Sequence, residues 1–181
     1  INGTSEARGD GVVPVTGLYF NGGENAGDHD VLNIVGGDQG SVVYGYGPAN
    51  GDGTVYISNF GLITYTGLEP ISNTGTADNV VFELPAGGTN AATLGDDGNA
   101  GNTMSRLSGA TFEQTDFANP TDSLYIRRGN ATDTIAMTSL PNLTSNIFIG
   151  DTDPFASFTF SGTTTLAVDK NIETYTSGPT S

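Results

Sequence analysis

The chain of 181 residues has no cysteine, no tryptophan and only one histidine. The lack of cysteine excludes disulfides, thiolate metal ligands and cysteine nucleophiles. The single histidine, His29, lies between acids in a glycine-rich turn. One histidine without a matched serine motif does not supply the residues of a catalytic triad. We therefore expect a protein that is not an enzyme and has no catalytic residues.

Positive charge is also scarce, because five lysine and arginine residues stand against 20 aspartate and glutamate residues, for a net charge of −15. A nucleic-acid-binding face needs basic side chains that displace counterions from phosphates, and none can be assembled here. Binding to anionic membranes is disfavoured for the same reason, and no apolar run is long enough for membrane insertion. A chain this acidic attracts divalent cations.

Short runs of β-branched and aromatic residues alternate with turns rich in glycine, asparagine and aspartate, a pattern that predicts strands. Aspartate opens four of these runs, at Asp30, Asp78, Asp122 and Asp133. No window places apolar residues at i, i+3, i+4 and i+7 over three turns, so helix content should be near zero. The expected strands are 17–20, 31–35, 41–46, 54–58, 62–66, 79–84, 105–107, 110–114, 123–127, 134–138, 146–149, 157–160, 163–168 and 172–175.

The fold class expected from this pattern is all-β, in a single domain over residues 1–181 without a linker. Low apolar content (35%) and a run of similar strands from Ser123 onward favour a parallel β-solenoid with coils of roughly 20–25 residues. The alternative is an antiparallel β-sandwich, and the stretch 41–66 suggests hairpins around Asn50-Gly51. Residues 85–104 are expected to form a long loop. Ile1 is not a start methionine, so we expect a mature protein or a segment of a longer one.

Three groups of carboxylates in glycine-rich turns are candidate metal ligands. Calcium takes six to eight oxygen ligands, and flexible acidic turns can supply them. The alternative is that each aspartate stabilises its own turn by accepting backbone N–H bonds. The candidates are Glu24, Asp28 and Asp30 in the first turn, Asp96 and Asp97 in the second, and Asp151 and Asp153 in the third. Calcium is the cofactor that these residues would hold.

The stretch Gly22-Gly23-Glu-Asn-Ala-Gly-Asp28-His-Asp30-Val-Leu-Asn-Ile34 resembles the repeats of very long bacterial surface and adhesin-like β-solenoid proteins. The phrase Leu62-Ile-Thr-Tyr-Thr-Gly-Leu-Glu-Pro70 is similar to a recurrent phrase of the same proteins. The resemblance implies an extracellular or cell-surface location and a structural or adhesive role, and it implies no activity. The first stretch also resembles the calcium-binding repeat of β-roll proteins. It departs from that repeat in two ways: Asn25 or Ala26 stands where the repeat needs a glycine, and the stretch is not repeated in tandem.

The sequence leaves three hypotheses for the function. The first is a non-catalytic extracellular module of a bacterial surface or matrix protein, with neighbouring domains, other copies or carbohydrate as partners. The second is a filament subunit that donates a terminal strand, from 1–11 or 174–181, to its neighbour. The third is a polysaccharide-active β-helix enzyme, which a groove with clustered acids and the Arg127-Arg128 pair would favour. Otherwise this arginine pair is expected to balance nearby acids.

Overall fold

The computed structural model describes residues 5–8, 17–23 and 30–178, and within these ranges the chain forms strands and turns without a helix. Over the same ranges there is accordingly no helix that could span a membrane. The all-β prediction is confirmed for the part of the chain that the structure describes. The strands are β1 (Ser5–Arg8), β2 (Leu18–Asn21), β3 (Leu32–Val35), β4 (Asp38–Tyr46), β5 (Gly53–Ile57), β6 (Gly61–Thr66), β7 (Ile71–Asn73), β8 (Thr76–Glu83), β9 (Ala91–Asp96), β10 (Met104–Gly109), β11 (Phe112–Ala118), β12 (Ser123–Arg127), β13 (Thr134–Met137), β14 (Asn146–Ile149), β15 (Ser157–Phe160) and β16 (Ile172–Thr174).

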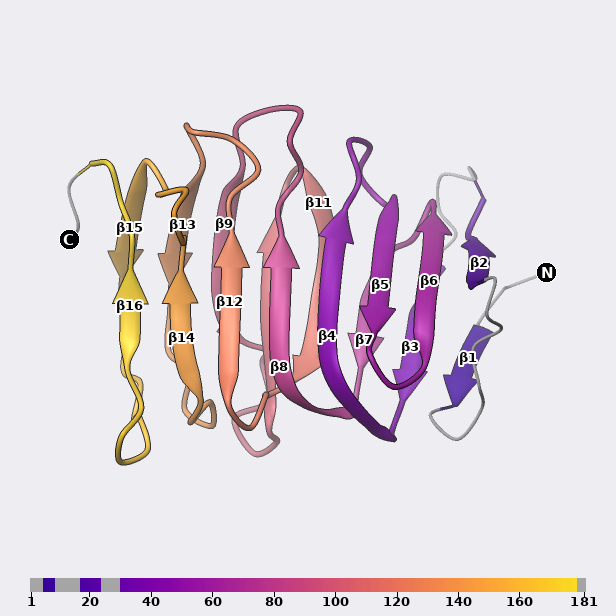
Figure 1. Ribbon diagram of the computed structural model, residues 1–181, viewed down its shortest axis with the longest axis horizontal. Coiled ribbons are helices and arrows are strands. Elements are labelled where there is room, and N and C mark those ends of the chain that lie inside the picture. Colours follow the sequence, from indigo (N-terminus) through magenta and orange to yellow (C-terminus); the bar gives the residue numbers. More distant parts are fainter. Residues whose placement is uncertain (1–4, 9–16, 24–29, 179–181) are drawn as a thin grey trace.

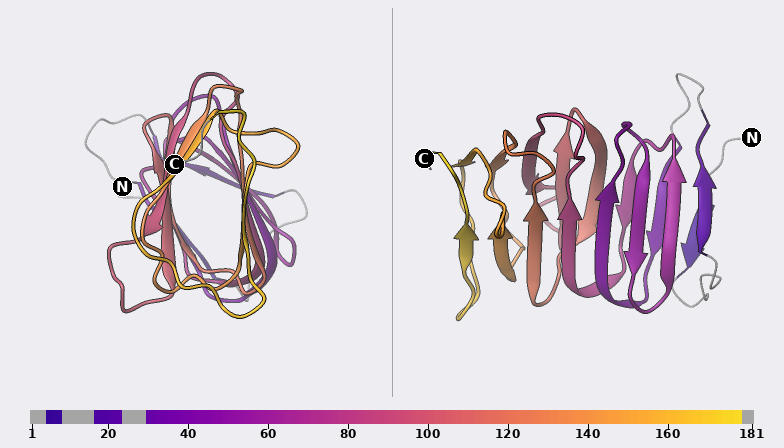
Figure 2. Two further views of the ribbon diagram at one scale, coloured as in Figure 1. Left: turned by 90° about the vertical axis from the view of Figure 1, so that its left-hand side faces the viewer. Right: turned by 45° about the horizontal axis from the view of Figure 1, so that its top comes forward.

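The strands form two sheets of eight, which face each other across one core (Figure 1). Sheet A has the order β1-β3-β7-β11-β10-β9-β13-β15, and sheet B has the order β16-β14-β12-β8-β4-β5-β6-β2. Figure 2 shows the two layers end-on, with the strands stacked along the long axis of the molecule. Within most strands buried and exposed residues alternate, as the pleat requires when one face of a sheet is covered.

From β11 onward the chain passes back and forth between the sheets, and each strand pairs in parallel with an earlier strand of its own sheet. Ser123 of β12 pairs with Asn146 of β14, 23 residues later, and Ile147 pairs with Ile172 of β16. This register places similar side chains side by side, such as Tyr125 and Phe148. The strands predicted at 123–127, 134–138, 146–149 and 157–160 are confirmed here.

The strand predicted at 163–168 is wrong. Thr164 makes an isolated bridge to Leu140, and no strand lies between β15 and β16. Val168 is 88% exposed, and Asp169 adopts a positive φ of 68° in the adjoining turn. The run has suitable residues, but it has no neighbouring strand to pair with along its length, and without a partner β propensity alone does not hold a strand.

Antiparallel hairpins interrupt the parallel winding at two places. β4, β5 and β6 pair antiparallel, and the β4–β5 turn contains Asn50 and Gly51, as predicted. Gly51 has a φ of +83°, a conformation that glycine adopts at little cost. β9, β10 and β11 form the second antiparallel set. Both sheets are therefore mixed, with the parallel ladders expected of a solenoid and the hairpins expected of a sandwich.

The long loop predicted over residues 85–104 is also wrong, because β9 lies inside it. Ala92 and Leu94 of this strand are buried, and β9 pairs with β10 on one side and β13 on the other. Its local sequence is rich in small and turn-forming residues. The backbone hydrogen bonds to the two neighbouring strands make this segment a strand, although its local sequence does not predict one.

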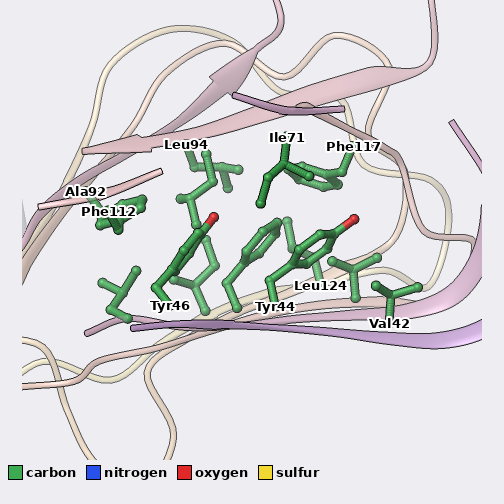
Figure 3. Close-up of a cluster of buried hydrophobic side chains, with 14 of the residues drawn as sticks. Val42, Tyr44, Tyr46, Ile71, Ala92, Leu94, Phe112, Phe117 and Leu124 are labelled. Carbon is green, nitrogen blue, oxygen red and sulfur yellow. The ribbon is translucent and has the colours of Figure 1, made fainter. Parts of the chain in front are cut away.

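Aromatic rings fill the middle of the core. Figure 3 shows Tyr44 and Tyr46 of β4 pointing between the sheets toward Phe112 and Phe117. Tyr44 stacks on Phe82 with ring centroids 4.7 Å apart, and Phe82 meets Phe117 edge-on at 4.9 Å. Such pairs add to the stability gained from burying apolar area. These rings are part of the core and cannot form a sugar-binding surface.

Several buried polar groups join neighbouring turns of the chain. Asn73 Nδ2 donates to Gln39 Oε1 (2.8 Å) and Tyr44 Oη (2.8 Å), and Gln39 Nε2 donates to Asn73 Oδ1 (2.9 Å). Gly75 lies against this pair, where a Cβ would come within 1.8 Å of Gln39 Nε2. The amide pair thus links the corner between β3 and β4 to the neighbouring corner between β7 and β8.

Candidate functional site

A hollow lies at the carboxyl ends of β8, β12 and β14, at the upper edge of sheet B in Figure 1. These strands are parallel neighbours, so their last residues meet at one edge of the sheet. Arg127, the last residue of β12, pairs in register with Glu83, the last residue of β8. The hollow has a volume of about 410 Å³. Its lining consists of Glu83, Ala86, Arg127, Arg128, Gly129, Asp151, Thr152 and Asp153, a set that we call the charged groove.

Two arginines and three carboxylates make ion pairs across the charged groove. Arg127 Nη1 lies 3.2 Å from Glu83 Oε1, and its Nε lies 3.8 Å from Asp151 Oδ2. Arg128 Nη2 lies 3.0 Å from Asp153 Oδ1. The prediction that the arginine pair balances nearby acids is therefore confirmed. The groove carries one more negative than positive charge, within reach of solvent.

Arg128 is the most enclosed charge of the groove, with a side chain that is 17% exposed. Its Nε is buried without a hydrogen-bond partner. A buried donor without a partner costs free energy. Nη2 of the same guanidinium donates to Asp153 Oδ1 at 3.0 Å.

A second hollow adjoins the first and shares Asp151 and Thr152 with it. Its volume is about 720 Å³, and its other lining residues are Pro154, Thr174, Tyr175 and Thr176. Tyr175 is 44% exposed, and its hydroxyl donates to Glu173 Oε2 at 3.1 Å. The two hollows thus lie next to each other at the carboxyl ends of the parallel strands from β8 to β16.

The structure places the predicted metal-ligating residues in three different settings. Glu24 and Asp28 lie outside the described residues, as does His29, while Asp30 is described and its carbonyl accepts the Glu69 N–H at 2.9 Å. Within the described ranges no group of three or more histidine, cysteine, aspartate or glutamate side chains is placed to hold a metal ion. The first calcium site thus remains a prediction.

Asp96 and Asp97 act in their turn as the alternative interpretation describes. Asp96 Oδ1 accepts the Gly98 N–H at 2.9 Å, and Asp97 Oδ1 accepts the Asn99 N–H at 3.0 Å. Asp97 Oδ2 accepts a further bond from Asn102 Nδ2 at 2.8 Å. Asp151 also accepts a backbone bond, from the Thr152 N–H at 2.7 Å. At the third predicted site, Asp151 and Asp153 already have the guanidinium partners described above.

Two buried carboxyl groups were not singled out from the sequence as sites. Asp133 is fully buried and accepts four N–H bonds, and Glu113 on β11 is buried near the hydroxyls of Tyr46 and Tyr65. Burial raises the pKa of Glu113 to about 7, and the nearby Glu69 carboxylate adds to this shift, while the Gln114 N–H opposes it. Glu113 is the second residue of an ordinary strand, so no local signal distinguishes it.

Glu83 was also missed as a site residue. It reaches the groove because β8 and β12 pair in register, 44 residues apart in the chain. Comparison of the chain with protein-family models, with curated proteins and with solved structures found no match. The function of this chain therefore has to be inferred from the geometry of the groove and of the sheets.

Proposed function

We propose that the protein is a non-catalytic extracellular module of a bacterial surface or matrix protein, with a structural and adhesive role. We infer with it that the C-terminal part winds as a β-solenoid, because β12, β14 and β16 return to the same sheet at intervals of 23 to 25 residues. Such a body is a rigid spacer that holds a binding surface at a fixed place.

The observation that carries the adhesive role is the charged groove. Its three carboxylates accept hydrogen bonds, and its two guanidiniums donate them, within a hollow of about 410 Å³. A polyhydroxylated ligand satisfies both kinds of group, because each sugar hydroxyl donates and accepts. The net charge of −15 repels acidic polymers. The ligand class that we infer is therefore a neutral polysaccharide.

The same ion pairs favour binding over catalysis. An arginine held against carboxylates stays protonated, so it cannot take a proton from a substrate as a lyase base would. Asp151 and Asp153 are each engaged with a guanidinium, at 3.8 Å and 3.0 Å. The polysaccharide-active enzyme is the second candidate, because the groove does bring acids and the arginine pair together.

The test is calorimetric titration with a panel of neutral and acidic oligosaccharides. We expect a neutral oligosaccharide to bind, and Glu83→Gln combined with Asp151→Asn to weaken binding at least about tenfold, since each lost charge-assisted bond contributes roughly 1.5–3 kcal/mol. Asp122→Asn is the matched control, because it removes one carboxylate of an exposed ion pair at the opposite ends of the same strands. Binding of acidic oligosaccharides alone, or of none, would contradict the proposal, and release of reducing ends would favour the enzyme.

A further inference from the structure

Both sheets end in an edge strand at the C-terminal end of the described chain. Within the described residues, β15 of sheet A and β16 of sheet B have a strand partner on one side only. Directly before β15, Phe155 already pairs with the chain's own C-terminal segment, through a parallel bridge to Thr176. Along β15 and β16 themselves, the outer sides present backbone N–H and C=O groups that a further strand could pair with. β1 and β2 are the corresponding last strands at the opposite end, which Figure 1 shows on the right.

The inner row of sheet A shows that the core becomes exposed at this edge among the described residues. Leu94, Met137 and Phe160 are in register on β9, β13 and β15, and their exposures are 0%, 1% and 40%. Phe160 has the same inward position as the two buried residues, but no further strand covers it. Tyr175, just after β16, is similarly exposed, and Val168 between the two strands is almost fully exposed.

The edge also lacks several of the features that usually prevent strand pairing. Lysine, proline and bulges protect natural edge strands. The seven residues of β15 and β16 include no lysine and no proline, and their one charged residue is Glu173. The strands are short, but the two sheets end at the same end of the molecule, so one partner could pair with both.

The direction of the strands identifies a partner that fits both edges at once. In sheet B every pairing from β16 to β4 is parallel, the two antiparallel pairings β4–β5 and β5–β6 cancel, and β6–β2 is parallel. β2 therefore runs in the same direction as β16. In sheet A the two antiparallel pairings of β10 cancel in the same way, so β1 runs in the same direction as β15.

We propose that copies of this chain stack head to tail, with β15 and β16 of one copy extending the sheets into β1 and β2 of the next. A copy placed beyond the C-terminal end in the same orientation continues both sheets with parallel pairing and covers Phe160. Because the two contacting surfaces differ, the contact does not close on itself, and repetition produces a filament. This assembly goes beyond the adhesive role and holds whether or not the groove binds sugars. It also differs from donation of a terminal segment as a strand, because strands already in the sheets make the contact.

Salt should promote this assembly, since each copy carries a net charge of −15. The first experiment is sedimentation velocity of the full chain over a concentration series, at low and at high sodium chloride, with electron microscopy of the same samples. We expect species that grow with concentration and salt into unbranched filaments. Phe160→Lys should weaken association at least about tenfold, because it puts a charge at the edge. Tyr56→Lys is the matched control, since Tyr56 is equally exposed (46%) on the interior strand β5, and it should assemble like the wild type.

A second measurement keeps the test decisive if Phe160→Lys fails to fold. The chain has no cysteine, so Asn21→Cys on β2 and Thr174→Cys on β16 introduce the only thiols. A flexible bis-maleimide should link the doubly substituted protein into a ladder of multimers, while each single variant stops at dimers. A wild-type protein that stays monomeric under all conditions, assemblies that end at two copies, or equal behaviour of the two lysine variants would each overturn the proposal.

Discussion

Replacement of Asp133 should remove a buried carboxylate that accepts four hydrogen bonds. Its Oδ1 accepts the Asn90 backbone N–H at 2.7 Å, and its Oδ2 accepts Asn90 Nδ2, the Gly129 N–H and the Asn130 N–H at 2.8–2.9 Å. The carboxylate is fully buried. It thereby ties the segment before β9 to the turn before β13, one turn of the chain later.

The expected loss of stability follows from the number of N–H donors that a substitution of Asp133 leaves without a partner. A hydrogen bond to a charged group contributes about 1.5–3 kcal/mol, and buried donors left unpaired cost a similar amount. Four such bonds are not additive, because water can enter the space left by the side chain. We expect Asp133→Ala to lower the free energy of unfolding by about 4 kcal/mol, and Asp133→Asn by about 2 kcal/mol, since the amide keeps one acceptor. The larger loss corresponds to a fall in Tm of about 8–16 °C for a domain of this size.

The assay is urea unfolding followed by circular dichroism, with equal m-values as the check that the unfolded states are comparable. Asp122→Asn is again the control, because it removes an exposed carboxylate whose partner is Lys170 Nζ at 3.1 Å, and surface pairs contribute less than about 1 kcal/mol. If Asp133→Ala and Asp122→Asn lose the same stability, the four-bond anchor has no net effect and the reasoning is refuted.

Two further predictions concern protons and calcium. Burial raises the pKa of Glu113 to about 7, so the folded protein holds a proton that the unfolded chain releases near pH 4.5. The stability that this proton contributes is therefore complete below about pH 4.5 and is lost as pH rises through 7. Glu113→Gln should therefore reduce the difference in unfolding free energy between about pH 5 and about pH 8 by roughly 2 kcal/mol in urea titrations, and an unchanged difference would contradict the burial argument. Calcium should raise the melting temperature beyond sodium chloride of matched ionic strength, by an amount equivalent to about 2.7 kcal/mol at a hundredfold excess over Kd. Asp28→Ala should abolish that gain, whereas an equal gain in this variant would place the ion elsewhere.

The local pattern of the sequence was sufficient to predict strands whose residues alternate clearly. The predicted bounds of β12, β14 and β15 agree with the structure, and the turn at Asn50-Gly51 was found from its dipeptide. The local pattern was not sufficient where pairing with a neighbouring strand determines whether a segment is a strand. β9 is a strand because β10 and β13 flank it, and residues 163–168 are not, because no strand lies beside them.

The charged groove was only partly predictable for the same reason. Asp151, Asp153 and the Arg127-Arg128 pair were each noticed, as local features of composition. Their meeting depends on the parallel register of β12 and β14, and the addition of Glu83 depends on a pairing that spans 44 residues of chain. A single sequence contains no direct signal of register, so the partners of these charges could not be named.

The four strand-opening aspartates show how repetition determines where the few basic residues are needed. Asp78 and Asp122 occupy the same corner of successive turns, because the Asp122 N–H donates to the Asp78 carbonyl at 2.9 Å. Such stacking brings like charges close together, which is unfavourable. Lys170, the only lysine, binds the Asp122 carboxylate from the segment before β16, although β14 lies between β12 and β16 in the sheet. Arg106, Arg127 and Arg128 each pair with a carboxylate of a neighbouring strand or turn. The basic residues with described side chains thus each lie against an acid that strand pairing brings close, and an acidic chain can keep its fold with so few of them.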